Sequence, residues 1–251
     1  MEAGNERAMY VYGVVRANGP PSEAKGIDDQ PLRVVAREGV AALTSEVPDR
    51  ELEAGRDELM THSRVLESAL ERGVVLPMRF GIVMPSEASV RERLLDAHRE
   101  VLERQLDEMD GKVEINIKGI YEEGTILHEL LAEDPEIARL RGEIEGKPEE
   151  ATYFERIRLG ELVAGGLEAK RSQDQQAVVE HLVPLAVAHE LGAQVHERMA
   201  VNASFLVARD KLARFDQEID KLGGEQAGRV RFRYTGPLPP HSFVELSLEA
   251  V

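Results

Sequence analysis

The chain contains no cysteine and no tryptophan among its 251 residues, and aromatic residues make up only 4% of it. Without cysteine, disulfide scaffolds, thiolate zinc sites, iron–sulfur clusters and cysteine nucleophiles are excluded. The few phenylalanines and tyrosines fall mostly in apolar segments. We therefore expect them to fill the core rather than to stack on nucleic-acid bases or sugars.

Long apolar runs and basic clusters are also missing. The longest apolar stretch, residues 182–188, spans seven residues and includes Pro184, whereas a membrane-spanning helix needs about 20. The first residues are polar and acidic, so a signal peptide is not expected. The formal charge of 31 − 47 = −16 would repel duplex nucleic acid and anionic membranes. These features indicate a cytoplasmic protein with neither nucleic acid nor a membrane as partner.

The hydrophobic content of 42% is enough for a packed core. In the first half, β-branched and aromatic residues predict a strand at residues 9–15. Two further strands, residues 32–36 and 40–45, are joined by a glycine-containing turn. Residues 74–83 are also extended, and Pro77 places them at a sheet edge or in a bulge.

Helical spacing of apolar residues predicts two helices in the same half, residues 57–72 and 86–109. Gly73 is expected to end the first with a left-handed cap, and Ser86 to cap the start of the second. The resulting order, β-β-β-α-β-α, is typical of a ferredoxin-like domain.

The second half repeats the alternation in the order β-α-β-α-β, so the predicted fold class is α+β with two domains. Pro184 and Gly192 leave the period of residues 184–198 undecided. Gly165 and Gly166 lie within a helical pattern, where they indicate close packing or a break. The expected strands are residues 112–118, 201–207 and 230–234. Helices are expected within residues 125–176, with an interruption near 146–148. A last helix is expected to begin at a cap at Asp210 and to end at Gly223 and Gly224.

The expected domain limits are 1–110, 111–236 and a tail at 237–251. Prolines hold the start of the tail extended as a linker. A short strand-like piece, residues 243–248, is too apolar to be left in water. We therefore predict that the tail packs on the N-terminal domain with Phe243 as its anchor.

Motifs for catalysis or metal binding are not evident. His181, His189 and His196 are separated by eight and seven residues, and seven residues already span about 10.5 Å along a helix, too far to share one metal ion. A nucleophile elbow and a glycine-rich phosphate loop are also missing. We therefore expect no catalytic residue, no metal and no organic cofactor.

Two sets of arginines call for an interpretation. Arg229, Arg231 and Arg233 follow one side of an expected strand, where they could meet an acidic partner surface. Pairing with a neighbouring carboxylate such as Glu114, or shielding of a sheet edge, is the favoured interpretation. Arg79 stands alone in an apolar segment, so we expect it to find a carboxylate or backbone carbonyls and to serve the structure.

Taken together, three segments resemble the gas vesicle protein F and L family. They are the opening strand at residues 9–15, then 62–66 leading into 75–81, and finally 201–207 preceding 235–244. The resemblance runs nearly end to end, and its most specific parts are the Leu-Pro-Met-Arg-Phe-Gly core and the double-proline ending. The motif residues, which the resemblance implies to be structural, are Leu76, Pro77, Arg79, Phe80, Gly81, Asn202, Phe205, Gly236, Pro237, Pro240 and Phe243.

The resemblance implies a non-enzymatic accessory protein, a minor component associated with the gas vesicle in the cytoplasm. Such a protein would bind the hydrophobic major shell protein, limit its aggregation during nucleation, and have other gas vesicle accessory proteins as further partners. It also implies two α+β domains, the first ferredoxin-like. Two other functions stay open: a small-molecule-binding regulatory module, which needs an apolar pocket, and an enzyme with dispersed carboxylates, which needs a raised pKa in a cleft.

Overall fold

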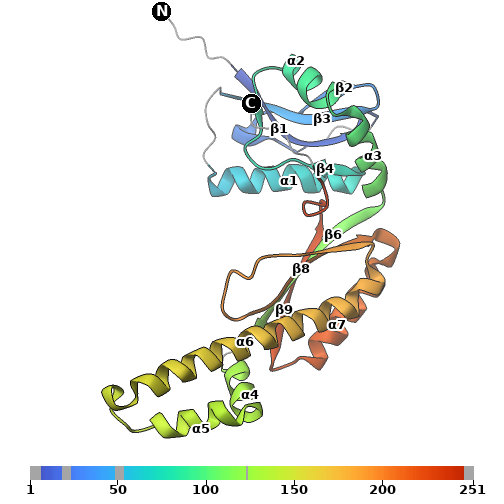
Figure 1. Ribbon diagram of the computed structural model, residues 1–251. Helices are drawn as coiled ribbons and strands as arrows, with labels where there is room; N and C mark the ends of the chain where they lie inside the picture. Colours follow the sequence, from blue (N-terminus) through green and yellow to red (C-terminus); the bar gives the residue numbers. More distant parts are fainter. Residues whose placement is uncertain (1–6, 19–23, 49–53, 123, 246–251) are drawn as a thin grey trace, which may run out of the picture. The chain divides into compact units, whose positions relative to one another are not determined.

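The computed structural model describes residues 7–18, 24–48, 54–122 and 124–245 (Figure 1). The chain divides into two compact units, residues 1–114 together with 236–251, and residues 115–235. Each unit contains one sheet with helices packed on it, which confirms the α+β class.

The first sheet contains β1 (Arg7–Arg16), β2 (Arg33–Arg37), β3 (Val40–Pro48), β4 (Val75–Pro77) and β5 (Val83–Met84). Its order is β2-β3-β1-β4, and β5 also pairs with β1. Because β1 is antiparallel to both β3 and β4, these two run parallel with β1 between them, as in a split β-α-β unit. The order of elements predicted from the sequence is confirmed, whereas the likeness to a ferredoxin-like domain stays a prediction.

Helix α1 (Arg56–Arg72) connects β3 to β4 and buries Val65 and Leu66 completely. Its C-cap, Gly73, has φ 165° and is therefore extended, so the predicted left-handed cap is wrong. The Gly73 N–H still bonds to the Ala69 carbonyl at 3.1 Å.

The helix predicted for residues 86–109 is interrupted. Ser86 caps it as expected, since its hydroxyl accepts from the Ser89 N–H at 3.1 Å. The segment then runs as α2 (Glu87–Ser89), a π-helical stretch (Val90–Asp96) and α3 (Arg99–Met109). The wider spacing is seen where the Ala97 N–H bonds to the Glu92 carbonyl at 3.2 Å, and residues 97–98 form a turn before α3 begins. The buried side chains still form one apolar face, made of Val90, Leu94, Leu95, Leu102, Leu106 and Met109.

The second sheet contains β6 (Lys112–Tyr121), β7 (Ala188–Leu191), β8 (Met199–Ala208) and β9 (Val230–Leu238), in the order β7-β8-β6-β9. Strand β7 lies in the part of the chain that the sequence left undecided. Strand β9 continues to Leu238, so the first part of the predicted proline-rich linker is strand instead.

Helix α7 (Leu212–Glu225) covers one face of the second sheet, where the rings of Phe205 and Phe215 lie 5.5 Å apart. Its predicted cap is wrong, because Asp210 lies in a 3₁₀ turn and Lys211 precedes the helix without a side-chain hydrogen bond. The helix also continues past its two glycines to Glu225.

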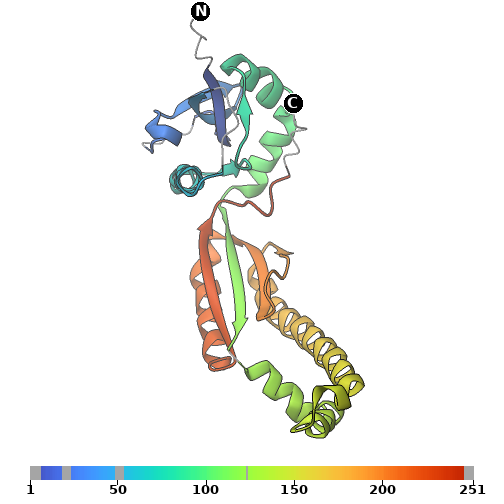
Figure 2. The same cartoon turned by 90° about the vertical axis from the view of Figure 1, so that its left-hand side faces the viewer.

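Between β6 and β7 the chain forms a helical arm, defined here as α4 (Thr125–Glu133), α5 (Pro135–Ile144) and α6 (Tyr153–Leu182) (Figures 1 and 2). Helix α6 runs unbroken through Gly166, where an added Cβ would lie 2.7 Å from Leu130 Cδ2. Close packing of α4 on α6 therefore explains this glycine. Of the helices that the structure describes, none is both long enough and apolar enough to cross a membrane.

Candidate functional site

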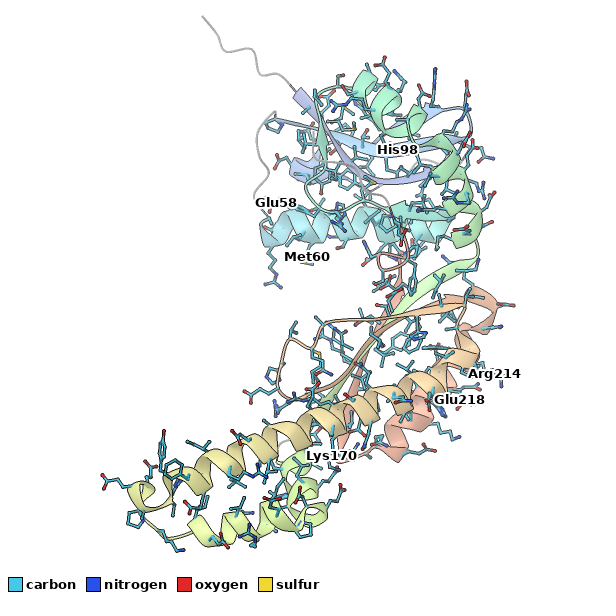
Figure 3. All side chains as sticks on the ribbon, in the orientation of Figure 1. Glu58, Met60, His98, Lys170, Arg214 and Glu218 are labelled. Atoms are coloured by element: carbon cyan, nitrogen blue, oxygen red, sulfur yellow. The ribbon has the colours of Figure 1, made fainter. Side chains whose placement is uncertain are left out.

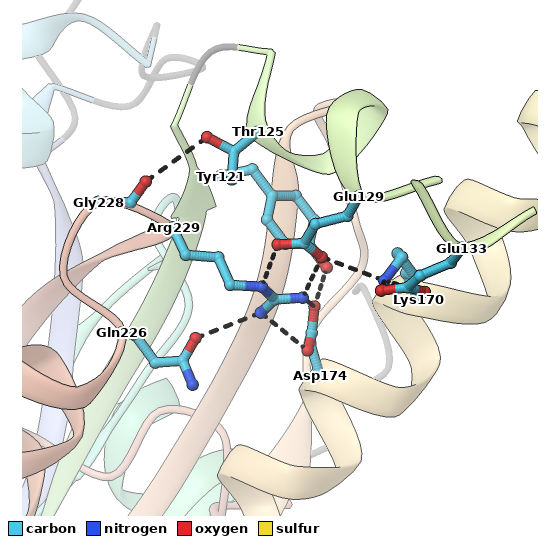
Figure 4. Close-up of polar contacts among 9 residues, drawn as sticks. All are labelled: Tyr121, Thr125, Glu129, Glu133, Lys170, Asp174, Gln226, Gly228 and Arg229. Atoms are coloured by element: carbon cyan, nitrogen blue, oxygen red, sulfur yellow. Dashed lines mark hydrogen bonds and ion pairs between the residues drawn. The ribbon is translucent and has the colours of Figure 1, made fainter. Parts of the chain in front are cut away.

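Arg229 lies directly before β9 at the centre of a half-buried ion cluster (Figure 4). Its Nε donates to Glu129 Oε1 at 2.6 Å, and its Nη2 donates to Glu129 Oε2 at 2.9 Å. The same guanidinium donates to Asp174 at 3.0 and 2.8 Å, and to Gln226 Oε1 at 3.2 Å. One arginine thus connects the start of β9 with α4, α6 and the end of α7.

Tyr121 and Lys170 extend this Arg229 cluster. The Tyr121 hydroxyl donates to Asp174, and its ring centre lies 5.7 Å from the guanidinium carbon of Arg229. The Lys170 ammonium, on a side chain only 12% exposed, donates to Glu129 at 3.1 Å and to Glu133 at 2.9 Å. Arg229 therefore holds the root of the helical arm to the start of β9, and Lys170 holds α6 to α4 through the same Glu129 carboxylate.

The pKa values in the cluster follow from these contacts. The hydrogen bond from Arg229 holds the pKa of the Glu129 carboxyl below its usual 4.5, and the hydrogen bond to Glu129 in turn raises the pKa of Arg229. Burial raises the pKa of Tyr121, and its bond to Asp174 adds to this. With Glu129 ionised and engaged by both cations, the cluster is suited to fixing helices rather than to transferring protons.

The partners of Arg229 correct the sequence prediction. Glu114, the carboxylate named for the arginine row, instead accepts hydrogen bonds from the Ser242 backbone N–H and hydroxyl, both at 2.8 Å. Asp174 gave no sequence signal, and Glu129 offered only its four-residue spacing to Glu133, which marks one helix face.

A second polar cluster lies in the core of the first unit. His62 Nδ1 accepts from the Tyr10 hydroxyl at 2.8 Å, and His62 Nε2 donates to the Met78 carbonyl at 3.1 Å. The Tyr10 oxygen also accepts from the Gly81 N–H at 3.2 Å. Burial lowers the pKa of His62 to about 4, so the ring is neutral at physiological pH and its single proton sits on Nε2.

These hydrogen bonds hold the segment that carries the Leu-Pro-Met-Arg-Phe-Gly motif. Leu76 and Pro77 are buried in β4, and the Phe80 ring lies 5.8 Å from the His62 ring. Gly81 has φ +91°, a conformation that favours glycine. Arg79 is exposed, and it forms no ion pair or hydrogen bond with the described residues, so its structural role stays a prediction.

The later motif residues lie in separate places. Asn202 donates to the Ala193 carbonyl at 2.8 Å and so holds the loop between β7 and β8. Phe205 is completely buried against α7. The bond between Gly236 and Pro237 is cis.

The tail returns to the first unit as far as it is described. Pro240 is buried and Phe243 is half-buried, and Gln105 Nε2 donates to the Glu245 carbonyl at 2.9 Å. Leu246 and Leu248, which the sequence analysis placed in the tail's apolar piece, lie outside the described residues. The limits 1–110, 111–236 and 237–251 remain predictions about independently folding parts.

The motif residues therefore do not meet in one site. Residues 76–81 and the tail belong to the first unit, whereas Asn202 and Phe205 belong to the second. Each contacts its own neighbours in a separate part of the fold. Their structural role stays a prediction.

The three histidines considered as metal ligands each have a different neighbour. His181 Nε2 lies 3.0 Å from Glu218 Oε2, and the His189 ring stacks on Phe205. His196 Nδ1 accepts from the backbone N–H of Arg198 at 3.0 Å. Across the described ranges, histidine and carboxylate side chains do not gather in any group of three that could hold a metal.

Exposed apolar side chains gather at the start of α6. Tyr153 is 60% exposed, Phe154 79% and Ile157 44%, and the two rings lie 5.4 Å apart. We call these three residues the arm-tip patch. Leu59 and Met60 on α1 are exposed as well and line a wide-open groove, and Met60 points away from the first sheet (Figure 3).

Comparisons with known proteins agree over nearly the whole chain. The family described as gas vesicle synthesis protein GvpL/GvpF matches residues 8–245. Gas vesicle protein F of Streptomyces sp. (strain CB03234) is 38% identical over 243 residues, which cover 95% of this chain and 100% of that protein. Gas vesicle protein F of Dolichospermum flosaquae is 27% identical, covering 95% and 98%. The crystal structure of GvpF from Anabaena sp. PCC7120 has a TM-score of 0.83 at 25% identity, covering 96% and 99%.

Proposed function

Because the chain belongs to the gas vesicle synthesis protein GvpL/GvpF family, we propose that it is an assembly protein that binds the hydrophobic major shell protein. In this role it limits aggregation of the shell protein while a vesicle nucleates. The observation that carries the proposal is the end-to-end match with gas vesicle protein F, in which 38% of the aligned residues are identical. The finer likeness of the first unit to a ferredoxin-like domain belongs to the same proposal.

The charge of the chain fits this role. A protein with a formal charge of −16 repels other copies of itself, so it stays dispersed when it carries an apolar cargo. Binding that cargo requires an exposed apolar patch, and the patch has to be limited because a large one also promotes self-association.

The arm-tip patch is the surface that we assign to the shell protein. Tyr153, Phe154 and Ile157 lie within four residues of one another, about one turn, at the start of α6. Aromatic side chains provide large contact areas at low entropic cost. Neighbouring charged residues such as Glu155 and Arg156 are exposed and would form the polar rim of the contact.

A dilution assay tests the proposal. Shell protein in denaturant is diluted into buffer with or without the chain, and light scattering and co-sedimentation are followed. We expect the chain to delay scattering and to stay in the supernatant together with shell protein. Equal scattering with and without the chain, and no co-purification, would refute the proposed function.

Two variants locate the surface. The triple substitution Tyr153→Ser, Phe154→Ser and Ile157→Ser should abolish the delay. The matched control, Leu59→Ser with Met60→Ser, removes exposed apolar side chains from α1 and should leave the delay unchanged. If only the control loses activity, the docking surface is on α1, and the arm-tip assignment is wrong although the function stands.

A further inference from the structure

Strand β9 is the outer strand of the second sheet, because the order is β7-β8-β6-β9 (Figure 2). An outer strand has backbone N–H and C=O groups on its free side that no neighbouring strand satisfies. From Arg231 to Thr235, every residue of β9 except Phe232 is classed as exposed. This edge is therefore open to another extended segment.

The two faces of β9 differ in chemistry. A Cβ added to Gly119 of β6 would lie 3.3 Å from both Phe232 and Val201, so these side chains share the face that α7 covers. Tyr234 lies on the same face, because its hydroxyl forms a hydrogen bond with Asp216 of α7. Burial and this bond raise the pKa of its phenol. Side chains alternate along a strand, so Arg231 and Arg233 project from the opposite face.

That opposite face is cationic along β9. Arg231 and Arg233 form no ion pair with any residue that the structure describes. Other arginines in sheets of this protein do find carboxylates: Arg33 pairs with Glu46 at 2.6 Å, and Arg37 with Asp96 at 2.9 Å. In a chain with 47 acidic and 31 basic residues, Arg231 and Arg233 place two positive charges side by side on one face of an outer strand.

We propose that the free edge of β9 binds an extended acidic segment of a partner protein by strand addition. The added strand would satisfy the open backbone groups, and its alternate residues would meet the two faces of β9 in turn. Acidic side chains would lie opposite Arg231 and Arg233. Apolar side chains between them would lie beside Phe232 and Tyr234. The partner is thus identified by a pattern in which acidic and apolar residues alternate.

A second copy of this chain is a poor occupant of the same edge. Pairing β9 with another β9 would bring the arginines of both strands together on one face, and like charges across a strand pair are unfavourable. Edge protection alone would explain charges of either sign at this edge. Positive charges in an acidic chain instead select one class of partner.

The test uses the full chain and a short synthetic peptide in which glutamate and valine alternate. Binding is followed by fluorescence anisotropy, and protection of the β9 amides by hydrogen exchange. We expect binding that weakens with salt and slows exchange in β9. A peptide of the same composition with its glutamates contiguous should bind less tightly, because it cannot match both faces.

Arg231→Glu with Arg233→Glu should weaken binding by about tenfold or more. Lys211→Glu with Arg214→Glu makes the same charge change at the start of α7, which Lys211 directly precedes (Arg214 is labelled in Figure 3), and should leave the affinity unchanged. If the first variant does not fold, Arg231→Ala with Arg233→Ala replaces it. Strand addition would be overturned by any of three results. The first is an equal loss of affinity in the α7 control, and the second is equally tight binding of the peptide with contiguous glutamates. The third is that hydrogen exchange of the β9 amides does not slow when the alternating peptide is added. Because the assay contains no shell protein, its result is independent of the proposed function.

Discussion

Protonation of His62 should make the stability of this protein depend on pH below neutrality. The folded ring is buried, with 5% of its surface exposed, and its pKa is lowered from 6.5 to about 4. In the unfolded chain the same ring titrates near its ordinary value. As the pH falls, the unfolded state therefore binds a proton that the folded state refuses, and the folded state loses stability.

The size of the effect follows from the two pKa values. The contribution is fully present above a pH of about 6.5 and is lost as the pH falls from there to about 4. One pKa unit corresponds to about 1.4 kcal/mol, so the full loss is about 3 kcal/mol, of which about 2 kcal/mol is reached near pH 5. Met78 and His241 act on this pKa in opposite directions, since the bond to the Met78 carbonyl raises it and the nearby His241 lowers it.

Urea denaturation followed by circular dichroism, at several pH values, measures this loss. Carboxylates also titrate in the range, so wild type is compared with His62→Gln, which has no ionisable group there. The gap in unfolding free energy between the two proteins should narrow by about 2 kcal/mol between neutral pH and about pH 5. His128→Gln replaces an exposed histidine and should follow wild type. A gap between wild type and His62→Gln that stays constant over this range would refute the reasoning.

Three further predictions concern stability. Arg229→Ala should lower the free energy of unfolding, measured by urea denaturation, by about 2–3 kcal/mol. This is somewhat less than for a fully buried pair, because the side chain is 27% exposed. Arg231→Ala should lower the free energy of unfolding little. Gly165→Ala should stabilise α6 by up to about 1 kcal/mol. Gly166→Ala should give a smaller gain in stability, because its Cβ would force Leu130 to move. Thermal melts of both variants measure the difference. Arg79→Ala should change the free energy of unfolding by less than about 0.5 kcal/mol, because the side chain has no partner among the described residues; a large loss of stability would show a contact that the structure lacks.

Local patterns predicted most of the elements. The alternation of Val113, Ile115 and Ile117 with polar residues identified β6, and the apolar stripe from Val90 to Met109 identified a helical segment. Both signals depend on neighbours within one or two turns, which a sequence displays directly. The π-helical stretch inside that segment left no such signal, because the apolar face continues through it.

Contacts between distant residues could not be predicted in the same way. Arg229 was identified as one of a row, but its partners lie 100 and 55 residues away, and many other carboxylates were equally available. Arg79 was expected to be paired because its neighbours are apolar. In the structure its side chain is exposed, directly before the turn at Phe80 and Gly81, and it has no partner among the described residues. Strand β7 was missed because it is short and fully exposed, so it carries no burial pattern.

The first unit is built from both ends of the chain, which has a consequence for the order of synthesis. The buried carboxylate of Glu114 receives two hydrogen bonds from Ser242, which is translated 128 residues later. The second unit, residues 115–235, is therefore complete on the ribosome before the first unit has all of its parts. Until Ser242 has been added, the nascent first unit contains a carboxylate without these two donors, so a chain that stops before Ser242 differs at Glu114 from one that includes it.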